Sequence, residues 1–152
     1  MLLGKIDREK GEYIPMAEEL RRKSLDSPDE TRTFDQGMAQ VVSLGDFKVA
    51  RHTFQPGWKW SEHVKPIAKT DSCQVKHTGY VVSGRLKVVM DDGFQEVFGP
   101  GDAYVIPSGH DGWVVSDTPC VVVDVSAETA EKFAKEEAPG LIDKAKDKLG
   151  RG

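Results

Sequence analysis

Four histidines carry the widest chemical potential in this chain, and His77 occupies the most informative position among them. It lies in the run CQVKHTGYVV, where alternation along a strand places it on the same side as Val75 and Val81. An imidazole among valines must satisfy two ring nitrogens by binding a metal, by hydrogen bonding or by contacting a ligand. We expect a functional role for His77, with a hydrogen-bonded core histidine as the alternative.

His110 directly follows a turn in which Pro107 and Gly109 constrain the backbone. The turn either directs the imidazole toward a cavity, or His110 holds the bend by a hydrogen bond to Asp111 or a main-chain carbonyl. His52 alternates with Phe54 on its own strand, and we interpret it as a structural or surface residue.

The two cysteines, Cys73 and Cys120, are too few for a disulfide framework, so we interpret them as reduced thiols. Cys73 precedes His77 by four residues, and on a straight strand their Cα atoms would be about 13 Å apart. This spacing favours Cys73 as a small buried hydrophobic residue that does not share a metal with His77, unless a bulge in the strand brings the two together.

The middle of the chain predicts an all-β fold, because short β-branched or aromatic runs alternate with turn signals from Met38 to Val125. Roughly seven or eight strands at this spacing indicate a sandwich or barrel. Asp92-Gly93 predicts a β-hairpin, since this pair supplies the positive φ of a tight turn.

Two flanking segments complete the predicted organisation. Residues 1–37 form an N-terminal arm with a short helix predicted over 15–23, and residues 38–126 form the barrel. Residues 127–152 show helical periodicity and predict a C-terminal helical tail that covers the barrel or a neighbouring subunit. At 152 residues the chain is long enough for one core.

Composition narrows the classes of partner. The formal net charge is −4 and no basic face is evident, so we expect no nucleic-acid partner. No apolar run is long enough to span a bilayer, and the first residues do not resemble a signal peptide, so we expect no membrane association and a cytoplasmic location.

From about Val41 to Val125 the chain resembles the cupins, small β-barrels of two facing antiparallel sheets that often hold a metal. The second cupin motif is matched by Gly101, Pro107 and Gly109, but Gly112 occupies the position of the usual histidine. The resemblance implies a jelly-roll barrel, or double-stranded β-helix.

The first cupin motif is matched in part. Gly57 and His63 fall in register, Lys65 replaces the second histidine, and His77 occupies the position that usually carries glutamate. With His110 standing in for the missing histidine, the resemblance implies an altered metal set of His63, His77 and His110. Such a set suits Zn, Fe, Ni or Cu and leaves coordination positions open.

Two functions remain open from the sequence, beside a third and weaker interpretation as a degenerate barrel that serves as a dimer scaffold. One is a metal-dependent enzyme that acts on a small organic molecule in the barrel. The other is a metal-free binding or regulatory module, which Lys65 favours because an ammonium repels a divalent cation. We expect a homodimer, because exposed sheet edges need covering. A ligand pocket is predicted from Trp58, Trp60, Lys65 and Trp113.

Overall fold

The computed structural model of the chain describes residues 4–15 and 19–125. The predicted C-terminal tail, residues 127–152, lies outside these residues. Among the residues described, no helix has the length and apolar character needed to cross a membrane.

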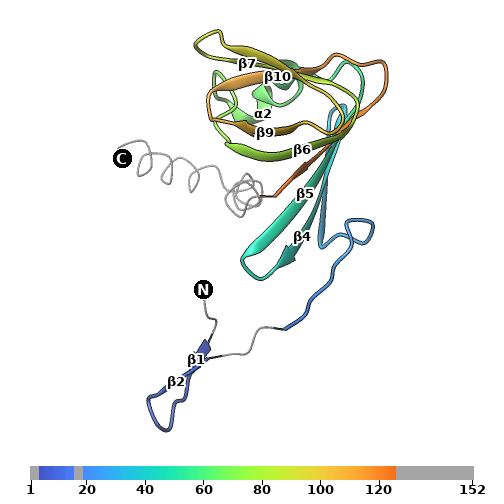
Figure 1. Ribbon diagram of the computed structural model, residues 1–152. Coiled ribbons are helices and arrows are strands. Elements are labelled where there is room, and N and C mark those ends of the chain that lie inside the picture. The colour runs from blue at the N-terminus through green and yellow to red at the C-terminus, as the bar shows by residue number, and fades with distance from the viewer. Residues whose placement is uncertain (1–3, 16–18, 126–152) are drawn as a thin grey trace.

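Two antiparallel sheets face each other and enclose the core (Figure 1). The larger sheet has six strands, in the spatial order β3 (Glu30–Phe34), β4 (Gly37–Leu44), β5 (Phe47–Phe54), β11 (Cys120–Asp124), β6 (His77–Ser83) and β9 (Ala103–Ile106). The smaller has three, in the order β10 (His110–Val114), β7 (Leu86–Met90) and β8 (Gln95–Phe98). The predicted all-β barrel architecture is confirmed.

Alternation along the strands explains which side chains enter the core. On β10 the buried residues are His110, Gly112 and Val114, whereas Asp111 and Trp113 are only partly covered. Strands of both sheets contribute to one hydrophobic cluster, which includes Phe54, Val81, Leu86, Val88, Tyr104, Ile106, Val114, Cys120 and Val122.

Two turns adopt backbone conformations that favour glycine. The predicted hairpin joins β7 to β8 in antiparallel pairing, and Gly93 in its turn has φ +90°. Gly109, with φ +91°, lies directly before β10, and a Cβ there would lie 2.8 Å from the Asp91 carboxylate. This turn therefore requires glycine on two counts, backbone conformation and space.

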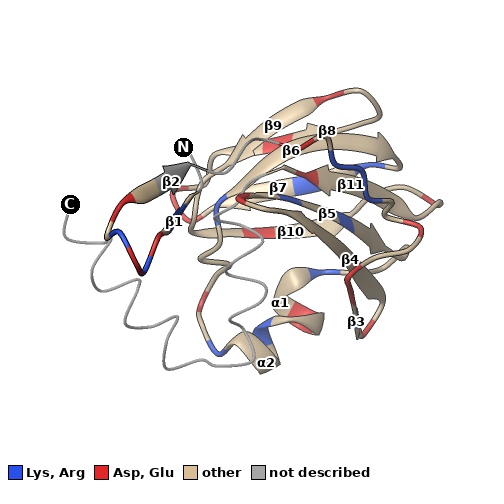
Figure 2. Ribbon diagram, turned by 90° about the horizontal axis from the view of Figure 1, so that it is seen from below, with Lys and Arg blue, Asp and Glu red and all other residues tan. Residues whose placement is uncertain are grey.

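One side of the barrel is covered by two short helices, α1 (Trp60–His63) and α2 (Lys65–Ala68), which Figure 2 shows beside β3. Neither was predicted. Lys69 ends α2 in the left-handed conformation, with φ 55°.

The N-terminal segment differs from the prediction. Tyr13–Pro15 form strand β2, which pairs with β1 (Gly4–Ile6), and residues 19–23 are not helical. The described part of the predicted helix has no apolar face to bury, since the side chain of Leu20 is fully exposed. β3 falls inside the predicted arm yet pairs with β4. The predicted boundaries at residues 37 and 126 stay predictions.

Candidate metal centre in the barrel

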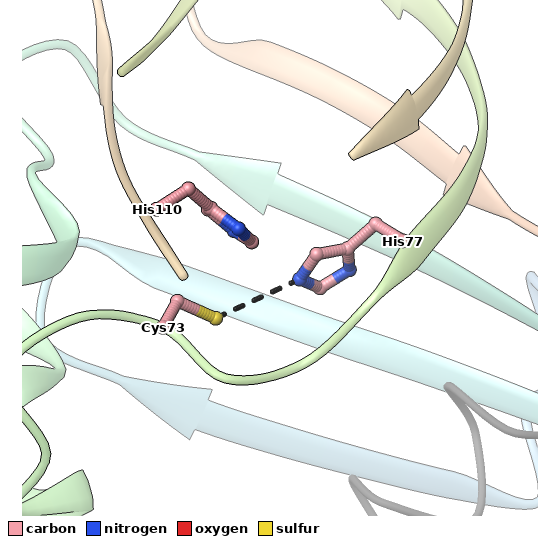
Figure 3. A group of neighbouring side chains, drawn as sticks. All are labelled: Cys73, His77 and His110. Carbon is pink, nitrogen blue, oxygen red and sulfur yellow. Dashed lines mark hydrogen bonds between the residues drawn. The ribbon is translucent and has the colours of Figure 1, made fainter. Parts of the chain in front are cut away.

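Cys73, His77 and His110 come together inside the barrel (Figure 3). Each offers one ligand atom, and these three atoms lie within 4.8 Å of one another. His77 opens β6, His110 opens β10, and Cys73 lies in the segment that leads into β6. The two imidazole rings meet edge to face, with centroids 5.4 Å apart.

Backbone pairing explains how Cys73 reaches the group. Cys73 and His110 form an antiparallel bridge, in which the Cys73 N–H donates to the His110 carbonyl (2.7 Å) and the His110 N–H to the Cys73 carbonyl (3.2 Å). Residues paired directly across an antiparallel bridge project their side chains to the same face. The thiol and the His110 imidazole therefore both point inward.

The prediction for Cys73 is thus corrected. It assumed a straight strand from Cys73 to His77, but β6 begins only at His77 and residues 74–76 have no strand structure. The chain bends there, as Figure 3 shows, and brings Cys73 Sγ to 3.8 Å from His77 Nε2. The thiol is buried, as predicted, but it is a member of the site.

Each histidine is fixed through its Nδ1 atom. His77 Nδ1 donates to the Asp124 carboxylate at 2.9 Å, and His110 Nδ1 donates to the Pro107 carbonyl at 2.7 Å. In both rings Nε2 is then the remaining ligand atom. A metal-binding histidine is commonly held in this way, because a partner on the other nitrogen fixes the tautomer and the ring orientation.

Asp124 is the hub of a buried network. Besides His77, its carboxylate accepts a hydrogen bond from the Tyr104 hydroxyl, and His52 Nε2 lies 3.3 Å from Asp124 Oδ2. Burial raises the pKa of Asp124, but hydrogen bonds from His52 and His77 outweigh burial and hold this pKa well below its usual range. Asp124 is therefore a buried carboxylate anion.

The two histidines of the site lower the pKa of the Cys73 thiol. Burial raises the pKa of Cys73, but hydrogen bonds and positive charge from His110 and His77 outweigh it and lower the pKa to about 6. Burial lowers the pKa of His77, but hydrogen bonds to Asp124 and Cys73 raise it to about 10. Without a metal, the two side chains therefore form a thiolate–imidazolium pair.

The donor set fits a transition metal. One thiolate and two imidazoles are soft to borderline ligands, which suit Zn, Fe, Ni or Cu and not Mg or Ca. Three protein ligands leave coordination positions open, as in catalytic sites. The group also lines a cavity of about 610 Å³, within the range of ligand pockets.

Of the other predicted site residues, His63 lies outside the group. It ends α1, where the Lys59 backbone N–H donates to its Nδ1 at 2.9 Å and its Nε2 lies 3.9 Å from Asp35. Helix α1 turns this ring back onto Lys59, the residue before its own first turn, and so away from the group.

The predicted pocket residues separate into two pairs. Trp58 and Trp60 are buried and line the cavity. Lys65 begins α2 and does not line it. Trp113 alternates with the buried positions of β10 and faces outward, where the ammonium of Lys59 lies 4.7 Å from its ring centroid.

Comparison with known proteins supports the fold. The family model of the cupin domain matches residues 51–126, half of the chain. No curated protein matches the chain.

Several solved structures are similar. A cupin-superfamily sugar phosphate isomerase from Silicibacter pomeroyi shares 21% identity at a TM-score of 0.51, over 69% of this chain and 74% of its own. The polyketide cyclase RemF from Streptomyces resistomycificus shares 19% sequence identity at a TM-score of 0.51, over 70% of this chain and 78% of its own. Oxalate decarboxylase from Lactobacillus farciminis shares 20% sequence identity at a TM-score of 0.49. The match covers 66% of this chain but only 31% of that protein. At these identities the likeness concerns the fold alone. On the family match and the barrel topology together, the chain belongs to the cupin family.

Proposed function

We propose that this cupin is a metal-dependent enzyme that acts on a small organic molecule in its barrel. Cys73 Sγ, His77 Nε2 and His110 Nε2 would hold a divalent transition metal ion. The observation that carries the proposal is the convergence of these atoms within 4.8 Å at a cavity wall, with both rings fixed through Nδ1. When bound, such an ion acts as a Lewis acid or activates water or dioxygen.

The chain's own residues have defined roles in this proposal. Asp124 orients His77 and holds its Nδ1 proton, and the Pro107 carbonyl does the same for His110. The apolar walls exclude water from the remaining coordination positions, which strengthens electrostatic interactions there.

The test is elemental analysis of the full-length protein, purified without added metal and again after loading with Zn²⁺. We expect about one metal ion per chain after loading, consistent with one three-ligand site. Cys73→Ser and His110→Ala should lose most of this metal. His63→Ala is the matched control, because its ring lies outside the group, and it should retain wild-type metal.

Cobalt loading gives a second readout, in which the deciding spectrum is that of the wild-type protein. Wild-type protein with Co²⁺ should show a thiolate-to-cobalt charge-transfer band, and Cys73→Ser should lack it. Absence of the band in folded wild type that has bound Co²⁺ would exclude Cys73 as a ligand. Loss of metal in His63→Ala but not in His110→Ala would assign the ion to a different site.

A metal-free binding function is the second candidate. It is favoured by the fact that Cys73, His77 and Asp124 satisfy one another's charges and hydrogen bonds without an ion. Wild-type protein that takes up neither Zn²⁺ nor Co²⁺ would select this candidate. The homodimer predicted from the sequence stays a prediction.

A further inference from the structure

The walls of the cavity that contains the metal group are mainly apolar and include several aromatic side chains. The rings of Phe54 and Trp58 stack, with centroids 4.0 Å apart and planes 26° apart. The other apolar side chains of the wall come from both sheets, from the helices and from the segments that join them: Phe34, Ala39, Trp60, Val64, Ile67, Ala68, Val75, Leu86, Val88, Ile106 and Val122.

The polar groups deep in this cavity are already engaged. The Asp124 carboxylate accepts from Tyr104 and His77 and has His52 at 3.3 Å. A polyhydroxylated ligand would bury several hydroxyls against the apolar walls without partners, at a cost of about 1–3 kcal/mol each. The cavity therefore disfavours sugar-like molecules and favours a flat carbon skeleton that packs on the stacked rings.

Positive charge marks the entrance. The exposed lining residues Thr33, Ile67 and Lys69 place the mouth between β3 and α2, which lie on the same side of the barrel (Figure 2). Lys69 and Arg32 are the cations among the lining residues, and the only lining carboxylate is the engaged Asp124. Arg32 is paired with Glu30 at 2.6 Å, which leaves Lys69 as the main attraction for an anion.

We propose that the cavity binds an aromatic carboxylate, with its ring system against Phe54 and Trp58 and its carboxylate directed to the metal group. This proposal rests on the proposed function, because the open metal position supplies the site for the carboxylate. The apolar walls favour an aromatic carbon skeleton over a polar one. Lys69 at the mouth favours a negatively charged ligand over a neutral one.

Isothermal titration calorimetry of the Zn²⁺-loaded full chain with three probes tests both requirements of this proposal, the aromatic skeleton and the negative charge. The probes are 2-naphthoate, its neutral analogue 2-naphthalenemethanol, and gluconate, a carboxylate with a polyhydroxylated chain. We expect 2-naphthoate to bind at least about tenfold more tightly than either of the others, which corresponds to about 1.4 kcal/mol.

Two lysines on one short segment provide a matched pair of variants. Lys69→Gln removes the charge at the mouth and should weaken 2-naphthoate binding about threefold, within the range for an exposed charge. Lys65→Gln removes a charge that does not line the cavity and should leave binding unchanged. Neither substitution should change Zn²⁺ content.

The outcomes separate this proposal from the one it rests on. Normal Zn²⁺ uptake with gluconate bound as tightly as 2-naphthoate, or with no probe bound, overturns the ligand class and leaves the metal centre intact. Equal binding of 2-naphthoate and 2-naphthalenemethanol overturns the requirement for charge. Failure to take up Zn²⁺ overturns the proposed function itself.

Discussion

At the scale of single residues, the distinguishing feature is the contrast between two buried thiols. Cys73 faces two histidines, which lower its pKa to about 6 against the effect of burial. Cys120 is fully buried among apolar groups, and burial raises its pKa to about 11. A thiolate is a metal ligand and a nucleophile, whereas a protonated buried thiol is inert, so the two cysteines have different chemistry.

We therefore predict that metal-free protein contains one thiolate per chain near neutral pH. Ultraviolet thiolate absorbance should rise as the pH increases through about 6, because the Cys73 proton is lost there. Cys73→Ser should abolish this rise, and Cys120→Ala should retain it. A rise that persists in Cys73→Ser would contradict the assignment, as would one that disappears in Cys120→Ala while the variant remains folded.

Site residues could be predicted from the sequence where the chain around them follows the simple alternation of a strand, and not where it bends or forms a short helix. His77 was predicted as a site residue from alternation along its strand, and His110 from the Pro107–Gly109 turn that precedes it. Cys73 was missed because its position depends on a bridge to His110, a contact between residues distant in sequence. His63 was placed with the metal set because it matches the first cupin motif, and the short helix α1, which turns its ring away from the group, has no strong signal in the sequence.

At the scale of elements, the strands, their turns and the β7–β8 hairpin were predictable, since alternation and Asp-Gly turn chemistry are local properties. The helix predicted over 15–23 is wrong for the residues described there, because helix formers alone do not stabilise a short helix without a face to bury. Close packing between strands is a further property that composition does not show. Gly79 on β6 is an example, since a Cβ there would lie 2.0 Å from the Val123 carbonyl oxygen on β11.

This close approach predicts that Gly79→Ala is strongly destabilising. The added methyl group would have to displace the backbone of β11, and we expect a loss of about 3 kcal/mol or more in the free energy of unfolding. Gly112→Ala is the control on the facing sheet, because a Cβ there would lie 3.4 Å from the nearest atom. Its effect should stay within about 1 kcal/mol. Urea unfolding monitored by circular dichroism compares the two, and equal losses would contradict the explanation.

At the scale of the whole molecule, Asp124 connects the fold to the site. It lies on β11, and its three partners Tyr104, His77 and His52 lie on β9, β6 and β5, so one carboxylate joins four strands of the larger sheet. The same group that orients a proposed metal ligand therefore also stabilises the barrel. Mutation of such a carboxylate should affect stability and metal binding together.

The pH dependence of stability separates this ionic role from simple packing. The folded-state pKa of Asp124 lies below its unfolded value of about 4, so its ionisation stabilises the fold fully above pH 4. That contribution falls as the pH drops below 4, by about 1.4 kcal/mol per pH unit. We expect Asp124→Asn to lower the free energy of unfolding by about 3 kcal/mol at pH 7, because three donors lose an anionic acceptor. The difference from wild type should shrink between pH 4 and pH 3, because only the wild type loses the ionised Asp124 carboxylate in that range. Urea unfolding at pH 7, 4 and 3 measures this difference, and a deficit that stays constant across the three values would show that Asp124 acts through shape and not through charge.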